Sequence, residues 1–228
     1  MKTTFKNILL ILLLVVVNVG IFVFCKITFD EQNYIWRKKV EPETLYMLES
    51  ACLDNFRIHY FLYSNAINLF LFSLYALSWN RLLAYVLMPL SLLLVVGGRY
   101  YFDDNISKNY YTIFKYQLVP EGYKMQPIQA AGKGIGHYLL EDAQNDYSTH
   151  RVHAIKGLGI IRYEPATSAL RVILEDSTEQ VSIRKESYLA LKKIKTTQSE
   201  KIISDFLNQY QDTEGELLKM ELAGVELK

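Results

Sequence analysis

Cysteine is scarce in this chain of 228 residues, and its second half has none. A disulfide framework is therefore excluded for that half. The two thiols are Cys25 and Cys52. Residues 22–24, directly before Cys25, are bulky, whereas a lipoprotein signal carries small residues there. We interpret Cys25 as a free thiol.

An excess of one charge is also missing. The 25 Lys and Arg residues nearly balance the 24 Asp and Glu residues, for a formal net charge of +1. A nucleic-acid partner would normally require a basic stripe or patch, so we expect none. A complete phosphate loop is absent too, since the glycine-rich run at 132–136 lacks the Gly-Lys-Ser/Thr ending. We expect a bend there, no cofactor and no enzymatic activity.

Long apolar runs are present, but nearly all of them precede Phe102. Runs 58–79 and 82–98 contain no Asp, Glu or Lys, and only Asn80 and Arg81 separate them. Each could cross the roughly 30 Å hydrocarbon core of a bilayer as a helix. So short a connection predicts an antiparallel hairpin.

An earlier run, 8–24, follows Lys2 and Lys6 in the layout of a signal peptide or signal anchor. No small-x-small cleavage site follows it, and it exceeds the usual apolar region of about 7–15 residues. We therefore expect a retained first span. The prediction is three transmembrane helices, at about 7–27, 57–79 and 82–102.

Helical periodicity extends beyond the predicted spans. Pro42 suits the first position of a helix, and apolar residues then recur at i, i+3 and i+4 up to Tyr60. We predict one helix over 42–79. A similar pattern after the third span continues through Ile113 and Phe114 to Pro120. Residues 1–118 would thus form a membrane domain with a helical stalk.

Four polar residues fall at a similar depth within the predicted spans. Amides are costly in hydrocarbon unless they are hydrogen-bonded, and side chains at one depth can satisfy one another. We interpret these residues as an interhelical polar layer; the alternative is a substrate or ion pathway. They are Asn18, Asn65, Asn68 and Ser91.

The second half contains an internal repeat. After a connector at 119–136, residues 150–161 align with 183–194 at a shift of 33, and a second predicted helix follows each copy. A period of 20–50 residues built from two short helices is typical of an α-solenoid. The shared positions are Asp146, Arg151 and Leu158 in one copy and Glu179, Arg184 and Leu191 in the other.

These positions resemble the HEAT-like repeats first noted in phycobilisome lyases. In that family an acid precedes a Val-Arg pair, and an Ala-Leu-Gly run ends the first helix. The resemblance covers about residues 143–211 and implies stacked helical hairpins with a protein-binding surface. It does not carry over the lyase activity, because nothing beyond the repeat matches.

We therefore predict an all-α protein: three transmembrane helices, two of them as a tight hairpin, followed by a short HEAT-like α-solenoid at 137–211. Because two copies are too few to be stable alone, we expect a partial repeat at 135–142 and cover by the stalk or by another protein. His137, His150 and His153 are interpreted as solvated side chains rather than metal ligands. The tail, 212–228, is left open between helix and strand.

The predicted function is a membrane-anchored interaction or scaffold subunit that presents the solenoid to a partner in a membrane complex. That partner would be another protein, either an envelope-complex subunit or a toxin-like protein. The alternative is a small transporter or channel component that uses the polar layer. We expect a bacterial inner-membrane location. The Lys and Arg distribution favours cytoplasmic repeats, although Lys2 and Lys6 favour the reverse orientation.

Overall fold

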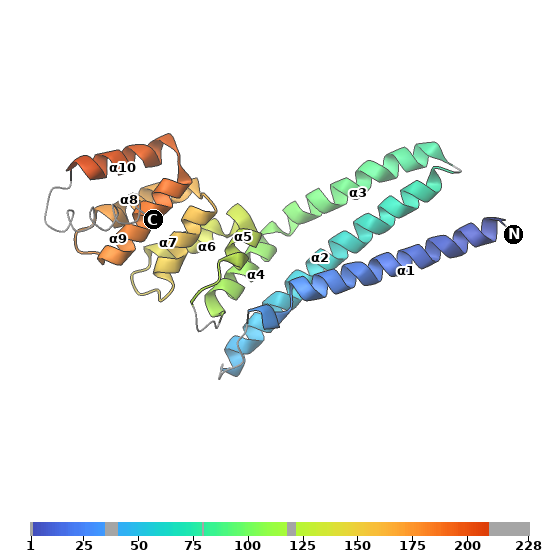
Figure 1. Cartoon of the computed structure of the whole chain (residues 1–228), viewed down its shortest axis with the longest axis horizontal. Helices are drawn as coiled ribbons and strands as arrows, with labels where there is room; N and C mark the ends of the chain where they lie inside the picture. Colours follow the sequence, from blue (N-terminus) through green and yellow to red (C-terminus); the bar gives the residue numbers. More distant parts are fainter. Residues whose placement is uncertain (1, 35–40, 79, 118–121, 210–228) are drawn as a thin grey trace, which may run out of the picture. The chain divides into compact units, whose positions relative to one another are not determined.

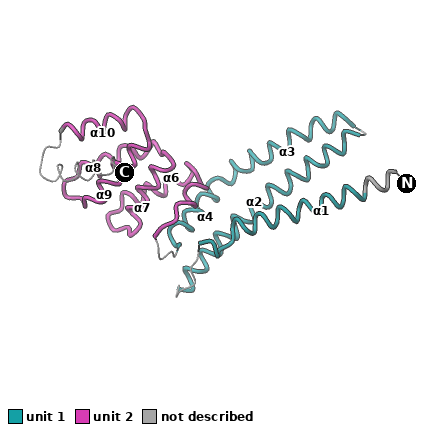
Figure 2. The backbone as a smooth tube through the Cα atoms, in the orientation of Figure 1, with its two compact units in different colours: residues 1–120 teal, residues 121–228 magenta. Residues whose placement is uncertain are grey.

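The structure of this chain is a computed structural model, and its regular elements are helices. It describes residues 2–34, 41–78, 80–117 and 122–209, and within these ranges there is no strand. The predicted all-α class is therefore confirmed for the described residues. The chain divides into two units, residues 1–120 and residues 121–228 (Figure 2).

Unit 1 is built around one long helix. α1 (Lys2–Thr28) and the 3-10 turn η1 (Glu31–Asn33) precede α2 (Pro42–Ala76), which is followed by α3 (Arg81–Tyr101) and α4 (Asp103–Tyr116). α2 contacts each of the other three α-helices and lies between α1 and α3 (Figure 1). As the sequence predicts, α2 begins at Pro42, whose missing N–H costs nothing in the first turn.

The connection between α2 and α3 is as tight as the sequence predicts. Asn80 caps α3, because its side chain accepts a hydrogen bond from the Leu83 N–H at 3.0 Å. Near the turn, Ala76 and Ala84 are fully buried. Far from the turn, the Leu62 side chain lies directly against Gly98, where a Cβ would have no room. The two helices therefore pack along their full common length.

By length and composition, the structure supports two of the three predicted spans. Within the described residues, two segments are long and apolar enough to cross a membrane, Ile8–Asn33 and Arg81–Tyr101. α2 falls short because His59, Asn65 and Asn68, together with several tyrosines, lower its mean hydropathy. Only 11% of the most apolar stretch of each of the two segments is buried within the chain. Their apolar side chains are thus largely exposed.

The helical pattern after the third predicted span forms a separate helix. The backbone departs from helical geometry at Phe102 (φ −93°, ψ 7°), and α4 begins at Asp103. α4 packs against α2, with Ile106, Ile113 and Phe114 almost fully buried. It ends at Tyr116, earlier than the predicted Pro120, which lies outside the described residues.

Unit 2 consists of short helices joined by short turns. Its elements are α5 (Gln126–Ala131), η2 (Gly132–Ile135), α6 (Gly136–Gln144), α7 (Arg151–Ile160), η3 (Glu164–Ala166), α8 (Thr167–Glu175), α9 (Val181–Ile194) and α10 (Thr197–Gln209). Much of the expected connector, 119–136, is therefore helical. The expected tail, 212–228, lies outside the described residues.

The two copies of the sequence repeat pack against each other. α7 contacts α9, α8 contacts α9 and α10, and α6 covers the other side of α7. Apolar residues of both copies are buried at this interface, and on α10 Ile202 faces inward whereas Ile203 is partly exposed. Fully buried members of this core include Leu139, Leu158, Leu170, Leu174, Leu191 and Phe206.

Candidate functional site

The arginines of the two repeat copies occupy equivalent places. Arg151 opens α7, and its Nε donates a hydrogen bond to the Ala143 carbonyl oxygen at 3.0 Å. Arg184, in the first turn of α9, donates from Nε to the Leu174 carbonyl oxygen at 3.0 Å. Both carbonyls belong to the penultimate residue of the preceding helix. Each arginine thus satisfies a carbonyl at a helix end that has no intrahelical donor.

The two acids of the repeat signature meet at Arg151. Its guanidinium lies 2.9 Å from the Asp146 carboxylate of its own copy and 2.5 Å from the Glu179 carboxylate of the next copy. The Arg151 and Glu179 side chains are only 10% and 11% exposed, whereas Asp146 is 73% exposed. Arg151 therefore joins successive copies by a pair of charges that water screens little. Leu158 and Leu191 lie elsewhere, in the core.

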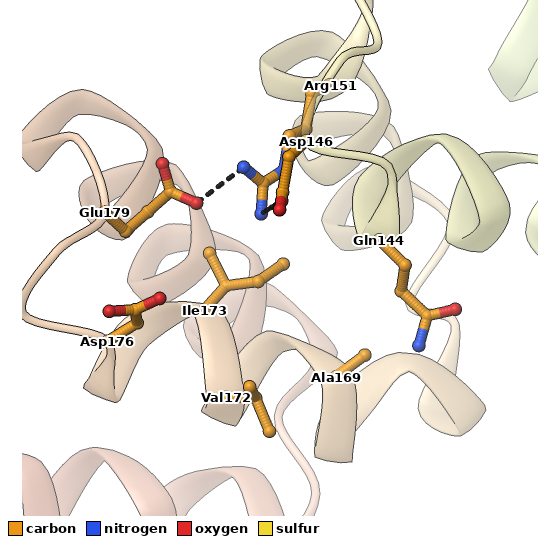
Figure 3. A pocket seen from close by; sticks show the side chains of 8 residues that line it. All are labelled: Gln144, Asp146, Arg151, Ala169, Val172, Ile173, Asp176 and Glu179. Atoms are coloured by element: carbon orange, nitrogen blue, oxygen red, sulfur yellow. Dashed lines mark ion pairs between the residues drawn. The ribbon is translucent and has the colours of Figure 1, made fainter.

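A pocket of about 320 Å³ lies beside this ion pair (Figure 3). Asp176 and Val172 of the α8 region face it, and Val172 is 68% exposed. Hydrogen bonds from the Thr178 hydroxyl and N–H hold the pKa of Asp176 below its usual range. The lining is Gln144, Asp146, Arg151, Ala169, Val172, Ile173, Asp176 and Glu179.

The lining determines what the pocket can hold. The lining contains three carboxylates and one guanidinium, so the pocket carries a net negative charge beside apolar side chains. An extended cationic side chain, with an apolar stem and a charged head, matches this arrangement. The repeat alignment finds Asp146, Arg151 and Glu179, but it misses Val172 and Asp176, which come from the exposed side of α8. Within the described residues, no group of three or more His, Cys, Asp or Glu could hold a metal ion.

The predicted polar layer in unit 1 is brought together only in part. Asn18 of α1 and Asn68 of α2 donate to each other, at 2.7 and 3.3 Å. Ser91 is buried on α3 but donates to the Met88 carbonyl of its own helix at 2.6 Å. Asn65 is exposed and donates to the Phe61 carbonyl, also in its own helix, at 2.8 Å. The Asn18–Asn68 pair satisfies itself, which suits a structural contact better than a substrate pathway.

A second polar contact, His59 with Arg99, was not expected from the sequence. Because a guanidinium can only donate, the 2.9 Å contact between Arg99 Nη1 and His59 Nε2 makes Nε2 the acceptor. His59 Nδ1 therefore carries the proton and donates to the Asn55 carbonyl at 2.8 Å. His59 is 4% exposed and stacks on Phe29, so it lies inside the packing of unit 1.

The histidines of unit 2 do not form one group. His137 is exposed, as expected, and lies against Tyr138. His150 and His153, in contrast, are half-buried against Tyr123: the Tyr123 hydroxyl bonds to His150 Nδ1, and its ring lies 4.5 Å from that of His153. Burial raises the pKa of Tyr123 and lowers that of His153. The two histidines therefore pack on an aromatic ring as structural groups.

Comparison with known proteins found no matching family model, no matching curated protein and no matching solved structure.

Proposed function

We propose that this protein is a membrane-anchored interaction subunit, in which α1, α2 and α3 lie in a bilayer and unit 2 binds a partner protein. One observation carries the proposal: the apolar side chains of α1 and α3 remain exposed, including Leu9, Val16 and Leu92, which are 58–67% exposed. Water would make such exposure costly, at about 25 cal/mol per Å². Lipid would remove that cost.

α2 enters the bilayer in this proposal because of its neighbours. It packs along α3 from the Asn80 turn to the Leu62–Gly98 contact. A helix held beside a spanning helix shares its environment. The Asn18–Asn68 pair supports this placement, because the two amides satisfy each other where water is absent. Three crossings then put the N-terminus and unit 2 on opposite sides; we favour an inner bacterial membrane with unit 2 in the cytoplasm.

For unit 2 we propose a short HEAT-like solenoid of the pairs α7–α8 and α9–α10, with α5–α6 as a shorter leading pair. The matching hydrogen bonds of Arg151 and Arg184 support this interpretation. A solenoid builds its binding surface from the same side of successive pairs. The pocket beside Arg151 spans two pairs and is the surface we assign to the partner. Its chemistry favours a partner that inserts a Lys or Arg side chain.

The membrane proposal is tested by extraction of the full chain from isolated membranes. We expect it to resist alkaline carbonate and high salt and to require detergent. A control that replaces exposed residues of α1 with charges, Val16→Lys and Val19→Asp, should weaken retention. Release of the unaltered chain without detergent would contradict the proposal.

The partner proposal is tested with a photo-crosslinking amino acid at position 172. We expect one protein to be captured, with capture reduced by Asp146→Asn combined with Asp176→Asn and by added salt, because exposed charges are screened. Lys201→Ala, an exposed change on α10, is the matched control. Capture that is indifferent to the carboxylates and to salt would overturn the pocket's assignment.

A further inference from the structure

Asn65 is the one member of the predicted polar layer that points away from the neighbouring helices. It is exposed on α2, and its Nδ2 donates to the Phe61 carbonyl of the preceding turn at 2.8 Å. Within the described residues, no hydrogen bond reaches its Oδ1. Asn68, three residues later, turns toward α1 and bonds to Asn18. Asn65 and Asn68 therefore differ in their surroundings: Asn65 is exposed, whereas Asn68 contacts α1.

The surface around Asn65 is otherwise apolar. Phe61 and Phe72 are 54% and 44% exposed, and with Asn65 they follow i, i+4 and i+11 spacing on one side of α2. Phe70 and Leu74, each 43% exposed, lie on the other open side, about 180° and 140° round the helix from Phe61. α2 lies between α1 and α3, so both sides remain open (Figure 1).

An amide oxygen facing hydrocarbon is unfavourable. Transfer of an amide to an apolar medium without a compensating hydrogen bond costs a few kcal/mol, about 1–3 on scales drawn from proteins. Polar residues in spanning helices are therefore usually paired across helices. The Asn65 side chain has a free acceptor and a second amide hydrogen beyond the one given to Phe61. It can donate and accept at the same time.

We propose that a second copy of this chain docks on this side of α2, with Asn65 of one copy bonded to Asn65 of the other. Two copies inserted in the same direction are related by an axis normal to the membrane, so identical residues meet at the same depth. An amide is self-complementary: each Nδ2 donates to the other Oδ1. Asn18 and Asn68 already make this reciprocal contact within one chain. The inference rests on the proposed membrane placement of α2.

The experiment is disulfide crosslinking of the full chain in its membrane, with Asn65 retained. Phe61→Cys or Phe72→Cys should yield a crosslinked homodimer on mild oxidation. Phe70→Cys and Leu74→Cys, on the other side, should not. The unaltered chain is a further control, since Cys25 and Cys52 are buried.

A second measurement isolates the amide. Asn65→Leu should weaken dimerisation about tenfold, as expected for two interhelical bonds of roughly 0.6–1 kcal/mol each. Asn65→Gln, which keeps donor and acceptor, should retain most of it. Because Asn65 is exposed, neither change disturbs packing within the chain.

The outcomes separate this inference from the membrane proposal. A chain that needs detergent for extraction but gives no crosslink at position 61 or 72 overturns the dimer and leaves the anchor standing. A crosslink to a different protein would also contradict the proposal that a second copy of this chain docks on this side of α2. Release of the chain without detergent would contradict both the membrane proposal and the dimer.

Discussion

Gly159 of α7 lies against the backbone of Ala190 of α9: a Cβ on Gly159 would come within 2.7 Å of the Ala190 Cα. Backbone atoms cannot move aside without shifting a helix, so Gly159→Ala should destabilise unit 2 by about 1–3 kcal/mol. The expected result is loss of hydrogen-exchange protection in the α7 and α9 peptides.

Gly157→Ala is the matched control. Its Cβ would also meet an atom at 2.7 Å, but that atom is the Ile128 Cδ1, the end of a flexible side chain. We expect a smaller loss of protection. Equal losses at the two positions would contradict the close approach of α7 to α9 as the cause.

The Arg151–Glu179 pair supports a second prediction. Arg151→Met leaves the 11%-exposed Glu179 carboxylate without this cation and should lower the free energy of unfolding of unit 2 by about 3–5 kcal/mol. Asp146→Asn, at the 73%-exposed partner, should cost less than about 1 kcal/mol.

A double-mutant cycle separates the pair from general damage. Arg151→Met combined with Glu179→Met should be less destabilising than the sum of the two single changes, since no buried charge is then left unpaired. Chemical denaturation monitored by hydrogen exchange of α7 and α9 provides the comparison. Simple additivity would mean that the two side chains are not coupled.

The repeat itself was accessible from sequence because its signal is local. A shift of 33 aligned Arg151 with Arg184, and both arginines lie in the first turn of a helix and bond to a carbonyl at the end of the preceding helix. The pocket was not accessible, because Val172 and Asp176 become its lining only when α8 packs beside the start of α9.

In unit 1 the apolar runs predicted helices and their tight turn, but not which side each polar residue faces. Their similar depth in the predicted spans led us to group Asn18, Asn65, Asn68 and Ser91 as one layer. In the structure their side chains point in different directions around the helix axes, so only Asn18 and Asn68 meet. One residue step turns a helix by about 100°, so depth alone does not decide contact. The His59–Arg99 contact was missed for the same reason: it depends on which face of α2 meets α3.

The Asn18–Asn68 contact supports a third prediction. Asn68→Leu should remove both bonds between the two amides, while Asn18 Nδ2 keeps its bond to the Leu14 carbonyl. The free energy of unfolding of the detergent-solubilised chain should fall by about 0.6–2 kcal/mol. Asn18→Leu combined with Asn68→Leu should recover part of the loss, because both amides are then removed. A double variant less stable than either single variant would contradict reciprocal bonding.

His153 supports a prediction of pH dependence. Burial is the main cause that lowers the pKa of His153, and Lys156 adds to it while Glu186 opposes it. The folded chain therefore takes up this proton at lower pH than the unfolded chain. The stability that neutral His153 contributes is fully present above the usual histidine value of about 6.5 and is lost as pH falls below it.

The measurement is unfolding of unit 2 at pH 7.5 and 5.5, followed by hydrogen exchange of α7. His153→Phe keeps a ring against Tyr123, which lies 4.5 Å from His153, but it cannot take up a proton. This variant should therefore show a flatter pH dependence with similar stability at pH 7.5. His137→Phe, at an exposed histidine, should keep the original slope. If both variants keep that slope, another group governs it, and the half-buried imidazole on Tyr123 is not the one that destabilises α7 in acid.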